Sequence, residues 1–256
     1  MTEMKSITKK KELGIDFSGV TQKFQWIEPG TFLMGSSQYE NVDRSEDLHP
    51  VTLTKGFWMA DTTCIQKVWE SIMGGNPCKV KGDYLPVEQI SHLEVLEFTK
   101  KISSEKLKFR LPTEAEWEHA CRAGTTTTYS FGQDIDVSQV NFDSREFSRK
   151  PGDNSKIDTN KVNEFRGCSV IAKSLPCNQW KLYGMHGNVQ EWCKDWFITH
   201  LGTEHVVDPR GGDTGITAVV KGGDWFYPKE WCRSAHRQGC QIDQPTDISF
   251  RLVLEF

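Results

Sequence analysis

The chain has 256 residues, a formal net charge of −4, 11% aromatic residues and nine tryptophans. Positive and negative charges are mixed along it, which excludes the basic footprint of a nucleic-acid-binding protein. No apolar run is long enough to span a bilayer, and no apolar segment follows the charged residues at the start. We therefore expect no membrane partner, no secretory signal and a cytoplasmic location.

The composition favours one domain, because no Pro/Ser-rich linker divides the sequence. We expect residues 1–20 to be a polar leader and residues 21–256 to form the domain. Residues 24–34 alternate loosely between apolar and polar and contain Pro29-Gly30. This pattern predicts a hairpin.

Further along, residues 36–49 are polar and acidic, which indicates a surface loop, and residues 51–59 resemble a strand. Apolar side chains then recur at i, i+3, i+4 and i+7 from Ile65. That spacing predicts a short helix, and the Gly74-Gly75 pair marks its end.

Two capping boxes predict two more helices. The first runs from Ser91 to Glu94, and the second from Thr113 to Glu116. We expect three side chains of the second helix to face the core: Trp117, Ala120 and Cys121.

Regular patterns fade after Gly124. Residues 143–167 are polar and indicate an exposed loop, whereas residues 219–225 and 250–256 resemble strands. About three short helices and several short strands in so long a chain predict an α+β fold with much irregular backbone.

Residues 180–196 combine three tryptophans with glycines and one carboxylate, Glu191, and have no helical or strict strand period. Gly184, Gly187 and Asn188 tolerate positive φ. A backbone turned in this way can direct carbonyl oxygens toward one point, and with Glu191 they would suit calcium. The alternative is a glycine-rich turn between aromatic core residues.

Eight cysteines are present, and no two of them form a C-x-x-C pair. A zinc ribbon is therefore not expected, and in a reducing compartment most of these cysteines would be buried thiols.

Several blocks together resemble the formylglycine-generating enzyme, or sulfatase-modifying factor, family. They include F-L-M-G-S (32–36), R-L-P-T-E-A-E-W (110–117), G-N-V-Q-E-W (187–192), K-G-G-D-W (221–225) and S-F-R-L-V (249–253). The resemblance covers roughly residues 22–256 and implies an irregular C-type-lectin-like α+β fold with short antiparallel strands, often with structural calcium. Oxidase members use a copper-binding cysteine pair and oxygen to convert a substrate cysteine into formylglycine.

The copper pair is missing from this chain. In oxidase members two cysteines follow the K-G-G motif, but here no cysteine lies between Gly223 and Cys232. Two thiolates are what a copper(I) site requires, so copper is not expected. Cys232 matches a later structural cysteine of the family, whose partner corresponds to Cys121. The resemblance implies that Cys121 and Cys232 lie close together, bonded or as adjacent thiols.

The resemblance also assigns calcium ligands. One family site corresponds to Gly184, Gly187, Val189 and Glu191, and Asn141 matches one ligand of a second site. The acidic D-G-F motif that would complete the second site is not evident. We expect at most one calcium ion, at Glu191.

The segment after K-G-G is expected to line a ligand groove that mixes aromatic and charged side chains. Such mixtures suit a peptide or a small polar ligand. The alternative is that the aromatic residues belong to the core, which we favour for Trp225. The expected lining residues are Gln190, Asp224, Trp225, Phe226, Tyr227, Trp231, Arg233, His236 and Arg237.

Catalytic candidates are few. Cys240 and His236 are the two that we consider, although a packing or surface role is the alternative for each. An iron site needs a set such as two histidines and a carboxylate, and the seven histidines include no H-x-x-x-H spacing. His49 and His186 are expected to be structural.

Three functions remain open. The first is a non-catalytic binding or accessory module for a peptide, protein or small-molecule ligand. The second is an oxidoreductase, either generating formylglycine or performing iron-dependent chemistry on sulfur metabolites. The third is a variable, lectin-like display protein. The missing cysteine pair favours the first function.

Overall fold

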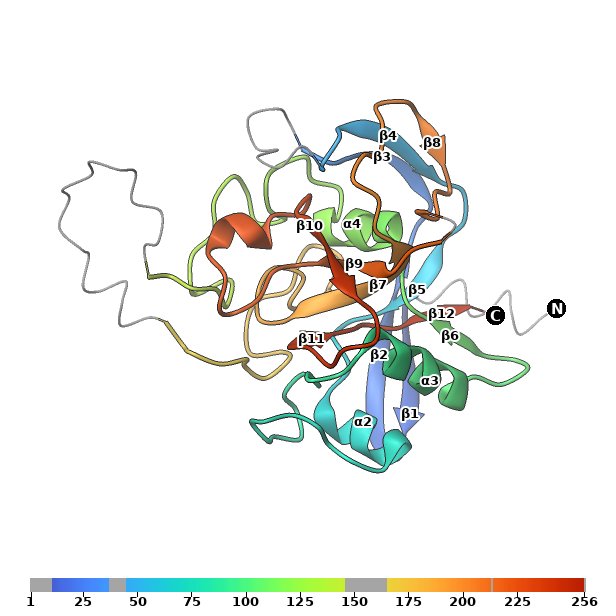
Figure 1. Cartoon of the computed structure of the whole chain (residues 1–256), viewed down its shortest axis with the longest axis vertical. Coiled ribbons are helices and arrows are strands. Elements are labelled where there is room, and N and C mark those ends of the chain that lie inside the picture. The colour runs from blue at the N-terminus through green and yellow to red at the C-terminus, as the bar shows by residue number, and fades with distance from the viewer. Residues whose placement is uncertain (1–10, 37–44, 146–164, 213, 256) are drawn as a thin grey trace.

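The computed structural model describes residues 11–36, 45–145, 165–212 and 214–255, and these form three small sheets around short helices (Figure 1). The largest sheet has the order β1 (Glu12–Phe17), β2 (Val20–Ile27), β5 (Phe57–Ala60), β12 (Val253–Glu255), β6 (Lys108–Arg110). The second sheet has the order β10 (Arg237–Gln241), β9 (Thr217–Lys221), β7 (Gln190–Trp196), β11 (Ile248–Ser249). The third has the order β3 (Gly30–Met34), β4 (His49–Leu53), β8 (Val206–Val207).

The helices form where local signals predict them. Helix α2 (Gln66–Met73) ends at Gly74, which adopts the left-handed conformation expected of a helix-terminating glycine. Helices α3 (His92–Ile102) and α4 (Glu114–Arg122) both begin with complete capping boxes. A short 3₁₀ helix, η1 (Lys229–Cys232), follows β9.

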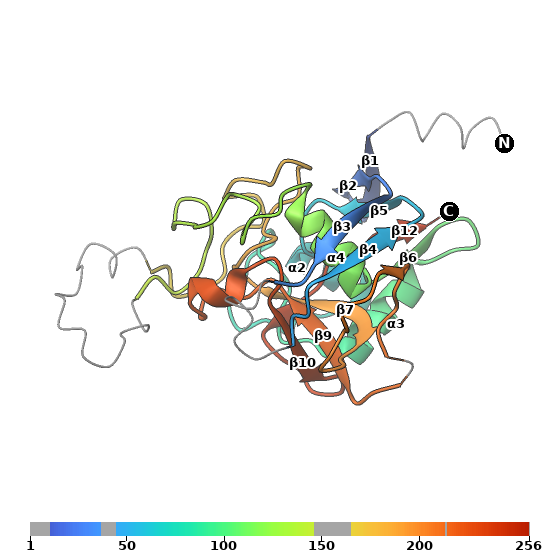
Figure 2. The ribbon, with the colours of Figure 1, turned by 90° about the horizontal axis from the view of Figure 1, so that it is seen from above.

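Helix α4 lies at the centre of the fold. It packs against β3 and β4 on one side and against β7 and β9 on the other (Figure 2). Trp117, Ala120 and Cys121, which were expected to face the core, have no exposed surface. This helix therefore joins the second and third sheets through one apolar cluster.

The prediction of a hairpin over residues 24–34 is wrong. Strand β2 pairs with β1 and β5, whereas β3 pairs with β4 in another sheet. Because proline has no amide hydrogen and fixes its own φ, Pro29 suits a point where the chain passes from one sheet to the next.

Residues 51–59 form parts of two strands, not one. Strand β4 ends at Leu53 and β5 begins at Phe57. Between them Gly56 lies against the Trp26 ring, and a Cβ atom at that position would come within 2.3 Å of it. The chain therefore changes sheet at a position where a side chain would collide with the tryptophan.

Three further expectations need correction. Strand β1 lies within the expected leader, of which residues 1–10 are outside the described part. Residues 180–196 were expected to have no strand period, but strand β7 occupies the second half of this segment. In the first half Gly184, Gly187 and Asn188 have the expected positive φ values of 62°, 65° and 67°. In the expected surface loop Glu46 is buried, with 1% of its surface exposed.

Other expectations hold only in part or concern residues that are not described. Residues 37–44 and 146–164 of the two expected loops lie outside the described part. The final strand was expected over residues 250–256, but β12 covers only Val253–Glu255, and β11 (Ile248–Ser249) precedes it as a separate strand. Of the helices in the described part, none has the length and apolar character needed to cross a bilayer.

Candidate functional site

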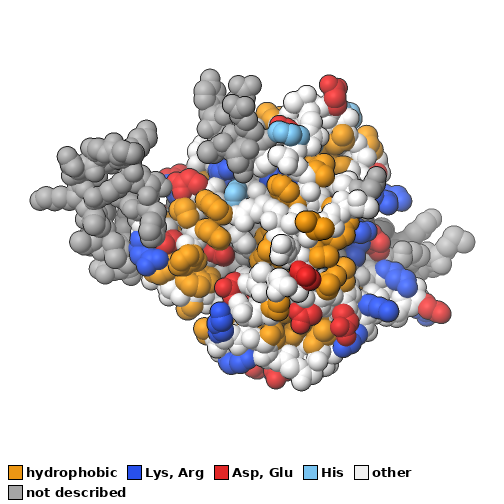
Figure 3. Space-filling model, in the orientation of Figure 1, with side chains coloured by type: hydrophobic (Ala, Val, Ile, Leu, Met, Phe, Trp, Pro, Cys, Tyr) orange, Lys and Arg blue, Asp and Glu red, His pale blue; other side chains and the backbone are white. Residues whose placement is uncertain are grey.

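A surface pocket of about 470 Å³ lies beside the second sheet and unites most of the expected groove residues. We call it the Asp224 pocket. It is lined by Gln190, Asp224, Trp225, Phe226, Tyr227, Gln238, Gly239, Cys240, Thr246, Asp247 and Ile248. On the face shown in Figure 3, hydrophobic and acidic side chains lie next to one another over the C-terminal segment.

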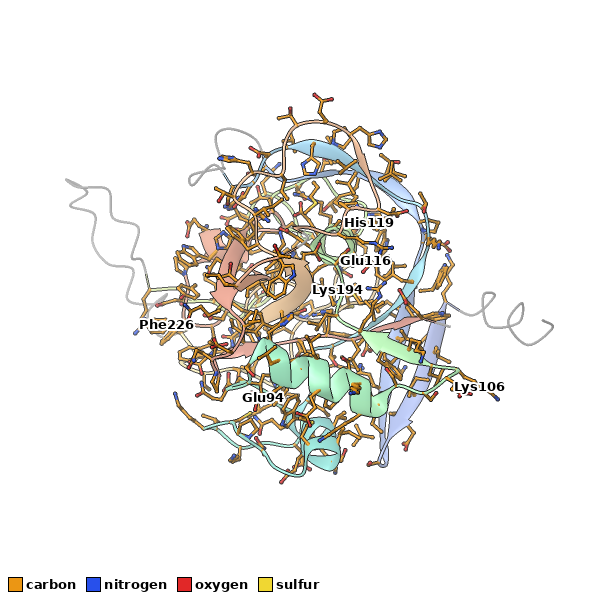
Figure 4. All side chains as sticks on the ribbon, turned by 45° about the vertical axis from the view of Figure 1, so that its right-hand side comes forward. Glu94, Lys106, Glu116, His119, Lys194 and Phe226 are labelled. Atoms are coloured by element: carbon orange, nitrogen blue, oxygen red, sulfur yellow. The ribbon has the colours of Figure 1, made fainter. Side chains whose placement is uncertain are left out.

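Three consecutive aromatic residues form one wall of the pocket. The Phe226 side chain is 58% exposed and lies at the edge of the molecule, away from helix α4 (Figure 4). The rings of Trp225 and Phe226 are 5.6 Å apart and nearly perpendicular. Tyr227 stacks on Trp231 at 4.3 Å, so Trp231 supports the wall from behind and does not line the pocket. Trp225 therefore belongs to the pocket wall and not to the apolar core clusters.

Asp224 is held in place by the turn that follows β9. Gly222 and Gly223 have positive φ values of 95° and 66° and reverse the chain. Asp224 Oδ1 then accepts hydrogen bonds from the backbone N–H groups of Phe226 and Tyr227, at 2.8 and 3.1 Å. Only 8% of the residue is exposed. Burial raises the pKa of this carboxyl to about 6, and Asp247 adds to the rise, while the two backbone donors oppose it.

Two further carboxyl groups lie near Asp224. Asp247 lines the pocket and accepts a hydrogen bond from the Gln89 side chain. Glu88 is also 8% exposed, and burial raises its pKa to about 7, with further contributions from Asp247 and Asp224. None of the described lining residues is a lysine, arginine or histidine. The pocket therefore holds concentrated acidic charge that no lining cation balances.

Cys240 contributes the one thiol among the described lining residues. It lies on β10 beside Gly239, whose backbone packs against the Phe197 ring. Burial raises the pKa of the Cys240 thiol, which keeps it protonated at neutral pH. A protonated thiol is a poor nucleophile and a poor metal ligand.

Arg233, His236 and Arg237 do not line the pocket, contrary to expectation. Arg237 is 2% exposed and donates to both carboxylate oxygens of Glu114, at 2.6 and 2.8 Å. Arg233 donates to both oxygens of Glu46, at 2.6 and 2.7 Å, and His236 lies 3.5 Å from the same carboxylate. Burial lowers the pKa of His236. These three side chains bind buried carboxylates, which gives them structural roles.

Glu191 is the centre of another buried ion pair. Its carboxylate accepts hydrogen bonds from Arg251 at 2.5 and 2.6 Å and from Trp117 Nε1 at 2.7 Å. Glu191 and Arg251 have no exposed surface. Calcium at Glu191 would compete with a guanidinium group for the same oxygens, which disfavours the expected site there.

The other expected calcium ligands surround the turn before β7. Gly187 donates its N–H to the Gly222 carbonyl and accepts from Val189 N–H. Asn141 donates to the Cys168 carbonyl and to Asn188, while its own Oδ1 is buried without a hydrogen-bond partner among the described residues. In the described part of the chain no group of three or more His, Cys, Asp or Glu is placed to hold a metal ion.

Cys121 and Cys232 both contact the same histidine, His186. His186 Nε2 is 3.6 Å from the Cys121 sulfur, and its Nδ1 is 2.7 Å from the Cys232 carbonyl oxygen. Both thiols are buried, and all eight cysteines of the chain are free, so the two are not bonded to one another. Burial lowers the pKa of His186 to about 4, which makes it a neutral hydrogen-bonding residue of the interior.

The fold and the site define an irregular α+β domain whose C-terminal segment forms the wall of a pocket. The family model described as "Sulfatase-modifying factor enzyme 1-like domain" matches residues 16–256. The chain therefore belongs to the sulfatase-modifying factor family, as its sequence motifs indicated.

Two curated relatives match parts of the chain. "Serine/threonine-protein kinase pkn1" of Chlamydia caviae is 38% identical over 132 residues, which cover 50% of this chain and 18% of that protein. "Formylglycine-generating enzyme" of Bos taurus is 30% identical over 151 residues, which cover 57% of this chain and 39% of that protein. The matched segments thus amount to less than half the length of either relative.

A solved structure shares the fold along most of the chain. It is the "Treponema denticola variable protein 1", with a TM-score of 0.78 and 22% sequence identity. The match covers 95% of this chain and 99% of that one. At this level of identity the likeness establishes the α+β fold alone.

Proposed function

We propose that this chain is a binding domain of the sulfatase-modifying factor family, that the Asp224 pocket holds its ligand, and that it is not a copper oxidase. The observation that carries the proposal is the content of the pocket wall. At the place where oxidase members of the family carry a cysteine pair, after Gly223, this chain carries Asp224 and three aromatic residues.

The thiols near this wall do not suit copper(I), which requires two thiolates within reach of one ion. Cys240 is the single lining thiol in the described part, and its pKa is raised. Cys232 is fully buried, and burial holds its pKa well above the usual range. Both groups therefore favour the protonated form that binds metal poorly.

The pocket has the composition of a recognition site. Ligand pockets combine apolar and aromatic walls with a few polar groups that orient the ligand. Here Trp225, Phe226 and Tyr227 supply the walls, and Asp224 and Asp247 supply the polar groups. A volume of about 470 Å³ is suited to a small molecule or to one or two side chains of a peptide.

Oxidation of a substrate cysteine is the second candidate. It is favoured by the position of Cys240 in the pocket and by the name of the Bos taurus relative. The two functions predict opposite results in one assay.

The test is mass spectrometry of a cysteine peptide with a C-x-P-x-R motif, incubated with the purified chain, oxygen, reductant and copper(I). We expect no conversion to formylglycine while an active control enzyme converts the same peptide. Conversion that is lost in Cys240→Ser would contradict the proposal and identify Cys240 as the reacting thiol.

A further inference from the structure

We infer that the ligand of the Asp224 pocket carries an organic cation, namely an ammonium or guanidinium group. This inference rests on the proposed binding function and specifies its ligand class.

The charge of the pocket is the first reason. Asp224 and Asp247 line it, and none of the described lining residues is basic. Lys79 is the cation that acts on Glu88, and it does not line the pocket. A cationic ligand would supply the missing positive charge.

The state of Asp224 is the second reason. The Asp224 residue is only 8% exposed, and its Oδ1 is fixed by two backbone N–H groups. Its Oδ2 has no hydrogen-bond partner among the described residues and belongs to a side chain that lines the pocket. Buried carboxylates are normally paired, so an oxygen left open at a pocket wall is suited to a ligand donor.

Two neighbouring groups repeat this pattern. Glu88 lies beside the pocket lining, is also only 8% exposed as a residue, and has no ion-pair partner within the described ranges. The Thr246 hydroxyl lines the pocket and is buried without a hydrogen-bond partner in the described part of the chain. Each group can accept a hydrogen bond, as the N–H groups of an ammonium or guanidinium require.

The aromatic wall distinguishes an organic cation from a metal ion. Ring faces attract ammonium and guanidinium groups, and Trp225, Phe226 and Tyr227 stand beside the carboxylates. A calcium or magnesium ion instead requires six or more oxygen ligands, and the described residues offer no cluster placed for a metal.

Isothermal titration calorimetry with matched probes tests the inference. The charged probes are the Nα-acetyl methylamides of L-arginine and L-lysine, and the neutral controls are those of citrulline and norleucine. We expect each charged probe to bind at least tenfold more tightly than its neutral control. A pentapeptide with a central arginine separates two sources of the cation, since tighter binding than the arginine amide indicates a peptide and equal binding indicates a small molecule.

Two variants and one control locate the binding. Asp224→Asn keeps the oxygen that accepts from the backbone, and Asp247→Asn changes an exposed side chain, so both should fold. We expect each to weaken the charged probes about tenfold and to leave the neutral probes unchanged. Asp83→Asn alters an exposed carboxylate that pairs with Lys67 and should change neither class.

The pH dependence gives an independent readout. Asp224 is faced by Asp247 and by the uncharged Tyr227 and Cys232, and Glu88 is faced by both aspartates and Lys79. The pKa values of about 6 and 7 mean that these carboxyls ionise between pH 5 and 8. Binding of the arginine amide, which stays charged, should therefore strengthen over that range in the native chain and less so in Asp224→Asn.

Two results would overturn the inference: equal affinity for charged and neutral probes, or no detectable binding of the charged probes at millimolar concentration. If neutral probes bind equally well and Phe226→Ala abolishes that binding, the binding function stands and only the cation is wrong. Formylglycine in the peptide assay would instead refute the binding function itself.

Discussion

Two regions of this molecule bury carboxylates and treat them in opposite ways. Around helix α4, Glu114, Glu118 and Glu191 are each bound by cationic side chains. At the Asp224 pocket, Asp224 in the lining and Glu88 beside it are buried near another carboxylate instead. Figure 4 shows how far Phe226, on the pocket wall, lies from Glu116 and His119 of helix α4.

The charge of these buried carboxyl groups is therefore decided by their partners and not by burial alone. Burial acts against ionisation of Glu118, but Lys221 and Arg122 outweigh it and lower the pKa. Among the described residues no cation contacts Asp224 or Glu88, and Lys79 opposes the rise at Glu88 without cancelling it, so their pKa values rise to about 6 and 7. The ion pairs of the first region stabilise the fold, whereas carboxyl groups with raised pKa values at a pocket are typical of a functional site.

The largest effect is expected where a buried pair is broken. Glu191→Gln would leave the Arg251 guanidinium buried without its countercharge, and such changes cost about 3–5 kcal/mol. Urea denaturation should show this loss in the free energy of unfolding. Glu97→Gln, which removes an exposed pair with Lys101, should cost no more than about 1 kcal/mol. An equal effect of the two variants would mean that the buried pair is not special.

Such pairs show what the sequence could not reveal. The capping boxes at Ser91 and Thr113 predict helices because each signal lies within four residues. The pair between Glu46 and Arg233 joins residues 187 positions apart, and no local pattern marks it. The expectation that Arg233 lines the groove failed because its partner lies on a distant loop.

A smaller effect of opposite sign is expected for Asp224→Asn. The folded state raises the pKa of Asp224 from 3.8 to about 6, so its contribution to stability falls as the pH rises through this interval. Above pH 6 the variant should be more stable than the native chain by up to about 3 kcal/mol, because it carries no buried charge. Below pH 4 the difference should vanish. Unfolding measured between pH 4 and 8 tests this, and a variant that is less stable at every pH would contradict it.

The pocket was predicted in part: Gln190 and residues 224–227 were expected to line it, and Cys240 was a candidate site residue. Residues 224–227 follow the K-G-G motif and were expected to line it, whereas Thr246, Asp247 and Gln238 were missed. The reason is topological: β11 pairs in parallel with β7, with Ile248 opposite Gln190. That pairing brings residues 246–248 to the pocket, and nothing in their own composition indicates it.

The smallest expected effect concerns calcium. Arg251 already holds both oxygens of Glu191, so millimolar calcium chloride should not raise the melting temperature above its value in a chelator. An increase of several degrees would show that calcium binds the folded chain after all, through Asn141 or through displacement of Arg251. Asn141→Ala and Glu191→Gln would then separate the two routes.

Strand β1 has a practical consequence for anyone who shortens this protein. It forms the edge of the largest sheet, and its Phe17 packs on Phe109 with ring centres 5.7 Å apart. A chain cut at residue 21, where the sequence alone placed the domain boundary, would lose this strand and expose the hydrogen-bonding groups of β2. Exposed edges recruit strands from other molecules. Aggregation of the shortened protein would therefore report the missing edge strand and not a defect in the pocket.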